Sequence, residues 1–95
     1  MFKIYYQSLV VSDDIPKLSG EWRVKVKSAI ESRLVSSPEM YGKPLRRPLN
    51  NYWKLRVGDY RIIFKIDKKI VVILMIEHRA VVYKYIMARI KRSSF

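Results

Sequence analysis

The chain has 95 residues, with 20 lysines and arginines against 8 acidic residues, and a formal net charge of +12. A hydrophobic content of 49% excludes a disordered chain, and this length supports one domain over residues 1–95. The absence of cysteine excludes disulfides and zinc–thiolate sites. No apolar run is long enough to cross a membrane, and the N-terminus lacks a secretory signal, so we expect a cytoplasmic protein.

The N-terminal half predicts one strand and two helices. Residues 2–7 are rich in aromatic and β-branched side chains, which favours a strand. Residues 12–14 (Ser-Asp-Asp) offer an N-cap for a short helix that has Pro16 near its first turn. After Gly20, apolar residues at spacings of three and four predict a longer amphipathic helix: Trp22, Val26, Ala29, Ile30 and Leu34. We expect the two helices to form an antiparallel hairpin on a sheet.

The C-terminal half predicts a loop, three strands and a helix. Prolines and glycine mark residues 38–51 as an ordered loop, and strands follow at 52–57, 60–66 and 70–76. Gly58 and Asp59 form a two-residue hairpin turn, and helical spacing returns over residues 80–91. The predicted fold is α+β: an antiparallel four-stranded sheet, with the helix hairpin packed on one face and a short C-terminal helix, in the order β-α-α-β-β-β-α.

The positive charge is concentrated in the second half of the chain. Residues 42–95 contain 14 basic and three acidic side chains, which is +11 of the net +12. A surface selected only for solubility mixes both signs, because a one-sided field is self-repelling. The distribution therefore favours a polyanionic partner over a merely solvated surface.

The two-residue turn fixes which side chains share a face of the sheet, since opposed residues point the same way. One face is wholly apolar or aromatic and must pack on the helices: Trp53, Leu55, Val57, Tyr60, Ile62 and Phe64. The other face carries Tyr52, Lys54, Arg56, Arg61, Ile63 and Lys65. It places Arg56 directly opposite Arg61, an arrangement that destabilises a sheet. Four cations in one patch favour an anion site over a solvated face, and arginine forks suit phosphate oxygens.

Further candidates follow the last strand. Arg79 and Tyr83 lie four residues apart, so both could approach one substrate from the same helix face, although a solvated arginine and a packed tyrosine are the ordinary alternatives. His78 is the only histidine and a poor candidate for a metal ligand. The sequence has no glycine-rich phosphate loop and no acidic cluster for metals. We therefore expect no metal and no cofactor, and phosphodiester chemistry that uses the 2′-hydroxyl of RNA as nucleophile.

Three motifs resemble the RelE/ParE toxin superfamily, and its RelE branch more closely. They are Tyr52-Trp53-Lys54-Leu55-Arg56-Val57-Gly58-Asp59-Tyr60-Arg61-Ile62-Ile63-Phe64, Val71-Val72-Ile73-Leu74, and His78-Arg79-Ala80-Val81-Val82-Tyr83. With the order of elements, the resemblance covers almost the whole chain. It implies a RelE-like toxin of a toxin–antitoxin pair that cleaves mRNA in the ribosomal A site. The implied partners are a cognate antitoxin, the ribosome and mRNA.

The resemblance also implies roles for particular residues. Lys54, Arg61, Arg79 and Tyr83 match the active-site lysine, arginines and tyrosine of the family. Tyr83 or Lys54 would take the proton of the 2′-hydroxyl, while the two arginines stabilise the charged phosphorane. Some relatives have a second lysine where this chain has Tyr52, which could instead stack on a base. The expected RNA-binding residues are Tyr52, Arg56, Lys65, His78, Arg46 and Arg47.

A second function stays open at this point: a ParE-like toxin that inhibits DNA gyrase by binding, without cutting RNA. The combination of Lys54, Arg61, Arg79 and Tyr83 favours the nuclease, because a gyrase inhibitor has no evident need for that set. Under either alternative, we expect the antitoxin to cover the basic face and to shift the helix at residues 80–91.

Overall fold

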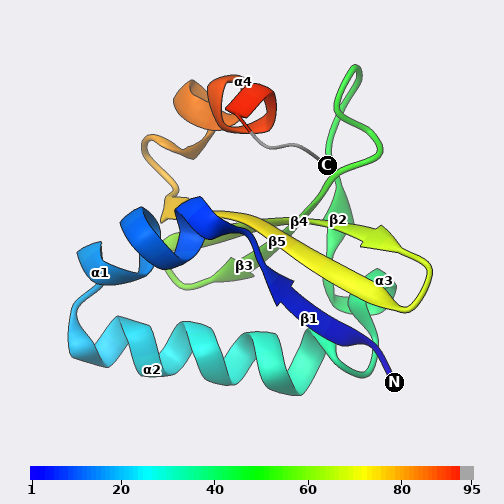
Figure 1. The fold of residues 1–95 in the computed structure, drawn as a ribbon, viewed down its shortest axis with the longest axis horizontal. Coiled ribbons are helices and arrows are strands. Elements are labelled where there is room, and N and C mark those ends of the chain that lie inside the picture. The colour runs from blue at the N-terminus through cyan, green and yellow to red at the C-terminus, as the bar shows by residue number, and fades with distance from the viewer. Residues whose placement is uncertain (93–95) are drawn as a thin grey trace.

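A computed structural model describes residues 1–92 and contains a mixed five-stranded sheet in the order β1-β5-β4-β3-β2 (Figure 1). The strands are β1 (Lys3–Tyr6), β2 (Lys43–Pro44), β3 (Trp53–Val57), β4 (Tyr60–Asp67) and β5 (Ile70–His78). The α+β class is confirmed, but the four-stranded antiparallel sheet was wrong in two respects. β1 pairs with β5 in parallel, and β2 adds a fifth strand from the predicted loop. β1 and β5 are far apart in the chain, because the helices and strands β2, β3 and β4 all lie between them.

The helices lie in two layers on either side of the sheet, as Figure 1 shows for α2 and α4. A π-helical turn, η1 (Val10–Asp14), runs into α1 (Ile15–Lys17), and α2 (Gly20–Ala29) runs into a second such turn, η2 (Ile30–Leu34). A short α3 (Pro38–Tyr41) precedes β2, and α4 (Val82–Arg92) ends the described chain. Within residues 1–92, no helix has the length and apolarity that crossing a membrane demands.

The start of the first helix differs from the prediction. Helical backbone begins at Ser8, ahead of η1, and Asp14 makes no capping hydrogen bond with its side chain. Instead, the Asp14 carboxylate is buried and accepts a hydrogen bond from the backbone N–H of Ile76 in β5 (2.9 Å). A side-chain cap that was not predicted lies at the start of α2, where Ser19 accepts from the N–H of Trp22 (3.4 Å).

Two apolar clusters hold the layers together. The larger lies between α2–η2 and the sheet, and contains Val26, Ile30, Leu34, Leu55, Ile62 and Phe64. This confirms the face that the hairpin register assigned to the helices. The smaller lies on the opposite face, where Val82 and Ile86 of α4 pack with Leu45, Ile63 and Met75. The basic face of the sheet is therefore partly covered by α4.

The β3–β4 hairpin has the predicted register, with Arg56 opposite Arg61 and Lys54 opposite Ile63. Gly58 adopts a positive φ of 56° in the turn. A side chain at this position would also collide with Trp22, because an ideal Cβ lies 2.4 Å from its Cη2 atom. The hairpin turn is thus packed directly against α2, which fixes the end of the sheet.

Candidate functional site

A cluster of cations occupies the face of β2, β3 and β4 that points away from α2. Lys43 pairs with Lys54, and Arg56 pairs with Arg61, so two pairs of like charges face each other across adjacent strands. Together with Tyr41, these four residues line a hollow of about 230 Å³. Each opposed pair costs the sheet from about 0.2 to 1 kcal/mol. Because the opposed cations do not stabilise the sheet, we infer that they serve to bind an anion.

A larger hollow of about 650 Å³ adjoins the first, between residues 43–49 and α4. Lys43 and Lys54 line both hollows, so the two meet at these lysines. The Nζ atom of Lys54 lies 5.6 Å from the ring centroid of Tyr83, within range of a cation–π contact. Arg46 and Arg47 line the same hollow, whose remaining wall includes Leu45, Leu49, Ile86 and Met87. This combination of cations and apolar surface suits a phosphate backbone with bases attached.

The hairpin turn holds the two arginines that the resemblance assigns to catalysis. Nη1 of Arg61 donates to the carbonyls of Gly58 (2.9 Å) and Tyr60 (3.0 Å), which leaves the other N–H groups of the guanidinium for a ligand. The backbone N–H of Arg79 donates to the Asp59 carbonyl (2.8 Å), and Nε of Arg79 lies 3.7 Å from Oδ1 of Asp59. Both side chains of that ion pair are more than half exposed, so Asp59 orients Arg79 but binds it weakly. Arg79 lines neither hollow.

Three predicted RNA-binding residues also lie outside the two hollows. His78 is opposite Tyr60, and its ring meets the Tyr60 ring edge-on (5.6 Å), so it lies on the face that α2 covers. Its Nδ1 accepts the N–H of Ala80 (3.0 Å). Tyr52 packs against the apolar cluster under α4. Lys65 is half-buried on β4, opposite Val72 of β5.

Sequence analysis missed Lys43 and Tyr41. Both lie in the segment predicted as an irregular loop, and a strand of two residues has too few positions to show an alternating pattern. The feature of the sequence that could have revealed this strand is Gly42, the buried residue between Tyr41 and Lys43. An ideal Cβ there would lie 2.5 Å from the Phe64 ring, so only glycine lets this segment approach the core closely enough for β2 to pair with β3.

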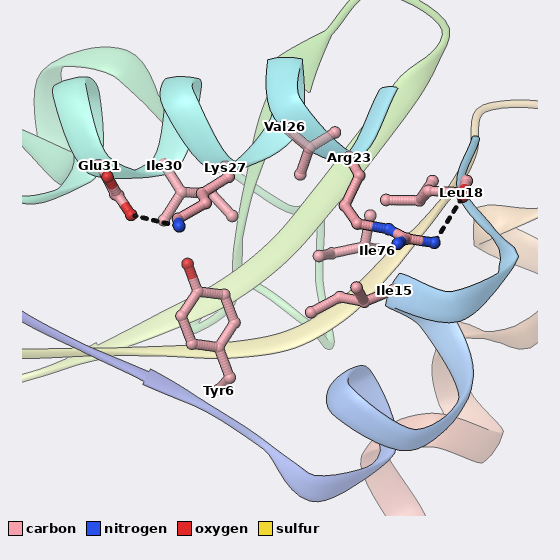
Figure 2. Close-up of a pocket in the computed structure, with 9 residues that line it drawn as sticks. All are labelled: Tyr6, Ile15, Leu18, Arg23, Val26, Lys27, Ile30, Glu31 and Ile76. Atoms are coloured by element: carbon pink, nitrogen blue, oxygen red, sulfur yellow. Dashed lines mark hydrogen bonds and ion pairs between the residues drawn. The ribbon is translucent and has the colours of Figure 1, made fainter. Parts of the chain in front are cut away.

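A third hollow, of about 290 Å³, lies on the opposite side of the sheet (Figure 2). Its wall is mostly aliphatic, from Ile15, Leu18, Val26, Ile30 and Ile76. Burial, and then the charge of Glu31, raise the pKa of the Tyr6 hydroxyl at its edge. Lys27 and Glu31 form an ion pair there at 4.0 Å. This hollow lacks the concentrated positive charge of the other two. Within residues 1–92, no three His, Cys, Asp or Glu side chains are placed to hold a metal.

Comparisons with known proteins identify the family of the chain. Residues 11–83 match the family model described as the ParE toxin of the type II toxin–antitoxin system parDE. The chain is 43% identical over 73 residues to Toxin RelG of Mycobacterium tuberculosis, covering 75% of this chain and 84% of that protein.

Solved structures show the same fold. The toxin–antitoxin complex RelBE2 of Mycobacterium tuberculosis matches with a TM-score of 0.76 at 32% identity, over 83% of this chain and 92% of that one. The isolated E. coli RelE toxin has a TM-score of 0.68 at 21% identity, over 95% of this chain and 99% of that one, which is evidence of fold alone. The chain therefore belongs to the RelE/ParE superfamily of type II toxins, in its RelE branch.

Proposed function

We propose that this toxin is a ribosome-dependent endoribonuclease that cleaves mRNA without a metal ion. The observation that carries the proposal is the approach of Lys54 to Tyr83, at 5.6 Å, where two hollows lined by cations meet. Two groups able to carry a proton thus lie together on a surface that attracts phosphate. A basic surface alone would serve any nucleic-acid-binding protein, whereas this pair suits proton transfer.

The proposed reaction is attack of an RNA 2′-hydroxyl on its own phosphate. Lys54 or Tyr83 takes the 2′-hydroxyl proton, the O2′–P bond forms, and the P–O5′ bond breaks as the departing oxygen gains a proton. The products are a 2′,3′-cyclic phosphate and a 5′-hydroxyl. Arg61 and Arg79, both held at the hairpin turn, stabilise the charge that develops on the phosphorane oxygens. The other exposed cations, Lys43, Arg46, Arg47 and Arg56, bind the flanking phosphates.

The partners are a cognate antitoxin, the ribosome and mRNA, and the cytoplasm is the compartment where they would meet. The relative in the RelBE2 structure is bound to its antitoxin, which supports the first of these. An antitoxin that covers the basic face has to contact or move α4, because α4 forms one wall of the larger hollow. We therefore expect amide hydrogen exchange in residues 80–91 to change when antitoxin is added.

The experiment is primer extension on cellular mRNA after induction of the toxin. The test variant is Arg61→Ala/Arg79→Ala/Tyr83→Phe. The matched control is Lys17→Gln, which removes an exposed cation outside both hollows. Cuts inside translated codons should appear with the wild type and with the control, and should vanish with the triple variant. Growth arrest with intact mRNA would contradict the nuclease proposal.

Gyrase inhibition is the second candidate, because the matching family model is that of ParE toxins. It predicts arrest with DNA-damage signals, intact mRNA, and activity that survives Tyr83→Phe. Purified gyrase assayed with the toxin separates the two functions directly.

A further inference from the structure

Asp14 and Arg89 form a buried ion pair that joins the first helical segment to the last helix. Nη1 of Arg89 lies 2.7 Å from Oδ2 of Asp14, and Nη2 lies 2.8 Å from Oδ1, so the contact is bidentate. The Asp14 side chain is 1% exposed and that of Arg89 is 11% exposed. The hydrogen bonds that Arg89 donates to Asp14 raise the pKa of Arg89, and the guanidinium stays charged. This is a specific contact between η1 and α4, 75 residues apart.

The pair also completes the edge of β5. β1 ends with Tyr6, which pairs with Ile73, so β5 continues beyond its parallel neighbour. There the Ile76 N–H donates to Oδ2 of Asp14 (2.9 Å), and the Leu74 carbonyl accepts from Nη1 of Arg89 (3.0 Å). Leu74 lies at a bulge, because Met75 pairs with Ile63 and Ile73 with Phe64. The ion pair thus takes the place of a strand at the point where the sheet edge would otherwise have unpaired groups.

Arg89 continues the buried stripe of α4. Val82 and Ile86 pack on the sheet in the first half of the helix, and Arg89 follows three residues after Ile86 on the same side. The apolar contacts of Val82 and Ile86 have no preferred direction, whereas the bidentate ion pair has a fixed geometry and so constrains the rotation of α4 about its own axis. Tyr83 is adjacent to Val82, so this rotation decides where the Tyr83 ring points.

We propose that Asp14 and Arg89 are positioning residues, whose ion pair holds α4 in the rotation that places Tyr83 beside Lys54. Neither side chain lines the two basic hollows, so both act through the helix. Loss of Arg89 leaves the Asp14 carboxylate buried without its counter-ion. This destabilises the arrangement in which α4 is docked on the sheet and favours its release from the sheet. The consequence for RNA cleavage rests on the proposed function, whereas the position of the Tyr83 ring does not.

The first test reads the ring position by NMR. The ring current of Tyr83 shifts the ε-CH2 resonances of Lys54, and Tyr83→Leu gives their position without the ring. Arg89→Gln should move these resonances most of the way to the Tyr83→Leu value. Arg89→Lys keeps the positive charge but cannot make the bidentate contact, so it should move them less. Exchange of the amides in residues 86–92 should accelerate about tenfold or more in Arg89→Gln.

The control is Ile30→Val, which loosens the core on the other side of the sheet and should leave the Lys54 resonances in place. If Arg89→Gln is poorly folded, Arg89→Lys and Asp14→Asn carry the same test. Wild-type resonances in all three variants, with lowered stability, would overturn the proposal and make the pair a purely structural contact.

The second test is steady-state cleavage of mRNA on ribosomes, which the proposed activity requires. Arg89→Lys should lower kcat while KM stays within about twofold, because the phosphate-binding cations are unchanged. A rise in KM with unchanged kcat would overturn the positioning role. If the wild type cleaves no RNA, the nuclease proposal fails, and the Lys54 resonances still decide whether the ion pair positions Tyr83.

Discussion

Replacing Arg56 by glutamine should stabilise the free toxin and weaken its binding to RNA. Arg56 is exposed and lies directly opposite Arg61, so the substitution removes one member of an opposed pair of like charges. Arg56 is the better choice of the two, because Arg61 also donates hydrogen bonds to the turn carbonyls that its removal would break. Lys54 stays in place in this variant, so the Lys43–Lys54 pair is unaffected.

The expected gain follows from the geometry of the pair. Opposed like charges on a sheet cost from about 0.2 to 1 kcal/mol. Glu77 lies opposite Arg61 on its other side, and its negative charge offsets part of this cost. We therefore expect a gain of about 0.5 kcal/mol at low salt. In a domain of this size that corresponds to a rise in Tm of about 2–4 °C.

The assay is thermal unfolding followed by circular dichroism in low and in 1 M KCl. At 1 M salt the screening length falls to about 3 Å, so the difference between Arg56→Gln and wild type should disappear. Lys17→Gln, which removes an exposed cation from α1, serves as the control and should change Tm little in either buffer. For single-stranded RNA, the slope of log affinity against log salt should fall by about 0.7 in Arg56→Gln.

Two results would refute the reasoning. A lower Tm for Arg56→Gln at low salt would mean that Arg56 makes a stabilising contact and is not under electrostatic stress. An unchanged salt slope would mean that RNA does not contact the cation cluster on β3 and β4.

Two further predictions concern the fold. Gly58→Ala should destabilise the protein by about 2 kcal/mol, because φ is positive and the new methyl group meets Trp22; Gly20→Ala, with open space around it, should have little effect in the same urea titration. Tyr6 has a pKa raised above its ordinary 10.0 by burial and by Glu31, so the folded state disfavours the phenolate and loses stability as the pH rises above 10. The stability of wild type relative to Tyr6→Phe should therefore be constant below pH 10.0 and fall as the pH rises above it in urea titrations, and a difference that stays constant throughout would contradict this.

Local patterns were enough to predict the β3–β4 hairpin and its two faces. The two-residue turn at Gly58 and Asp59 leaves one register, and strict alternation then assigns every side chain on both strands to a face. The amphipathic helix after Gly20 was predictable for the same reason, since its apolar stripe has the helical period. The approach of Lys54, Arg56 and Arg61 to one another therefore follows from the turn and the alternation alone.

Other features needed the tertiary structure, because they depend on contacts between distant segments. β1 pairs in parallel with β5, which lies more than 60 residues later in the chain, and β2 is too short to have a pattern of its own. Asp14 looked like a helix cap, but it is a buried partner of Arg89. The sequence determined which side chains share a face of each strand, because the backbone of a β-strand points successive side chains to opposite faces. The structure alone decided that α4 brings Tyr83 to Lys54, because the docking of a helix depends on packing with residues far away in the chain.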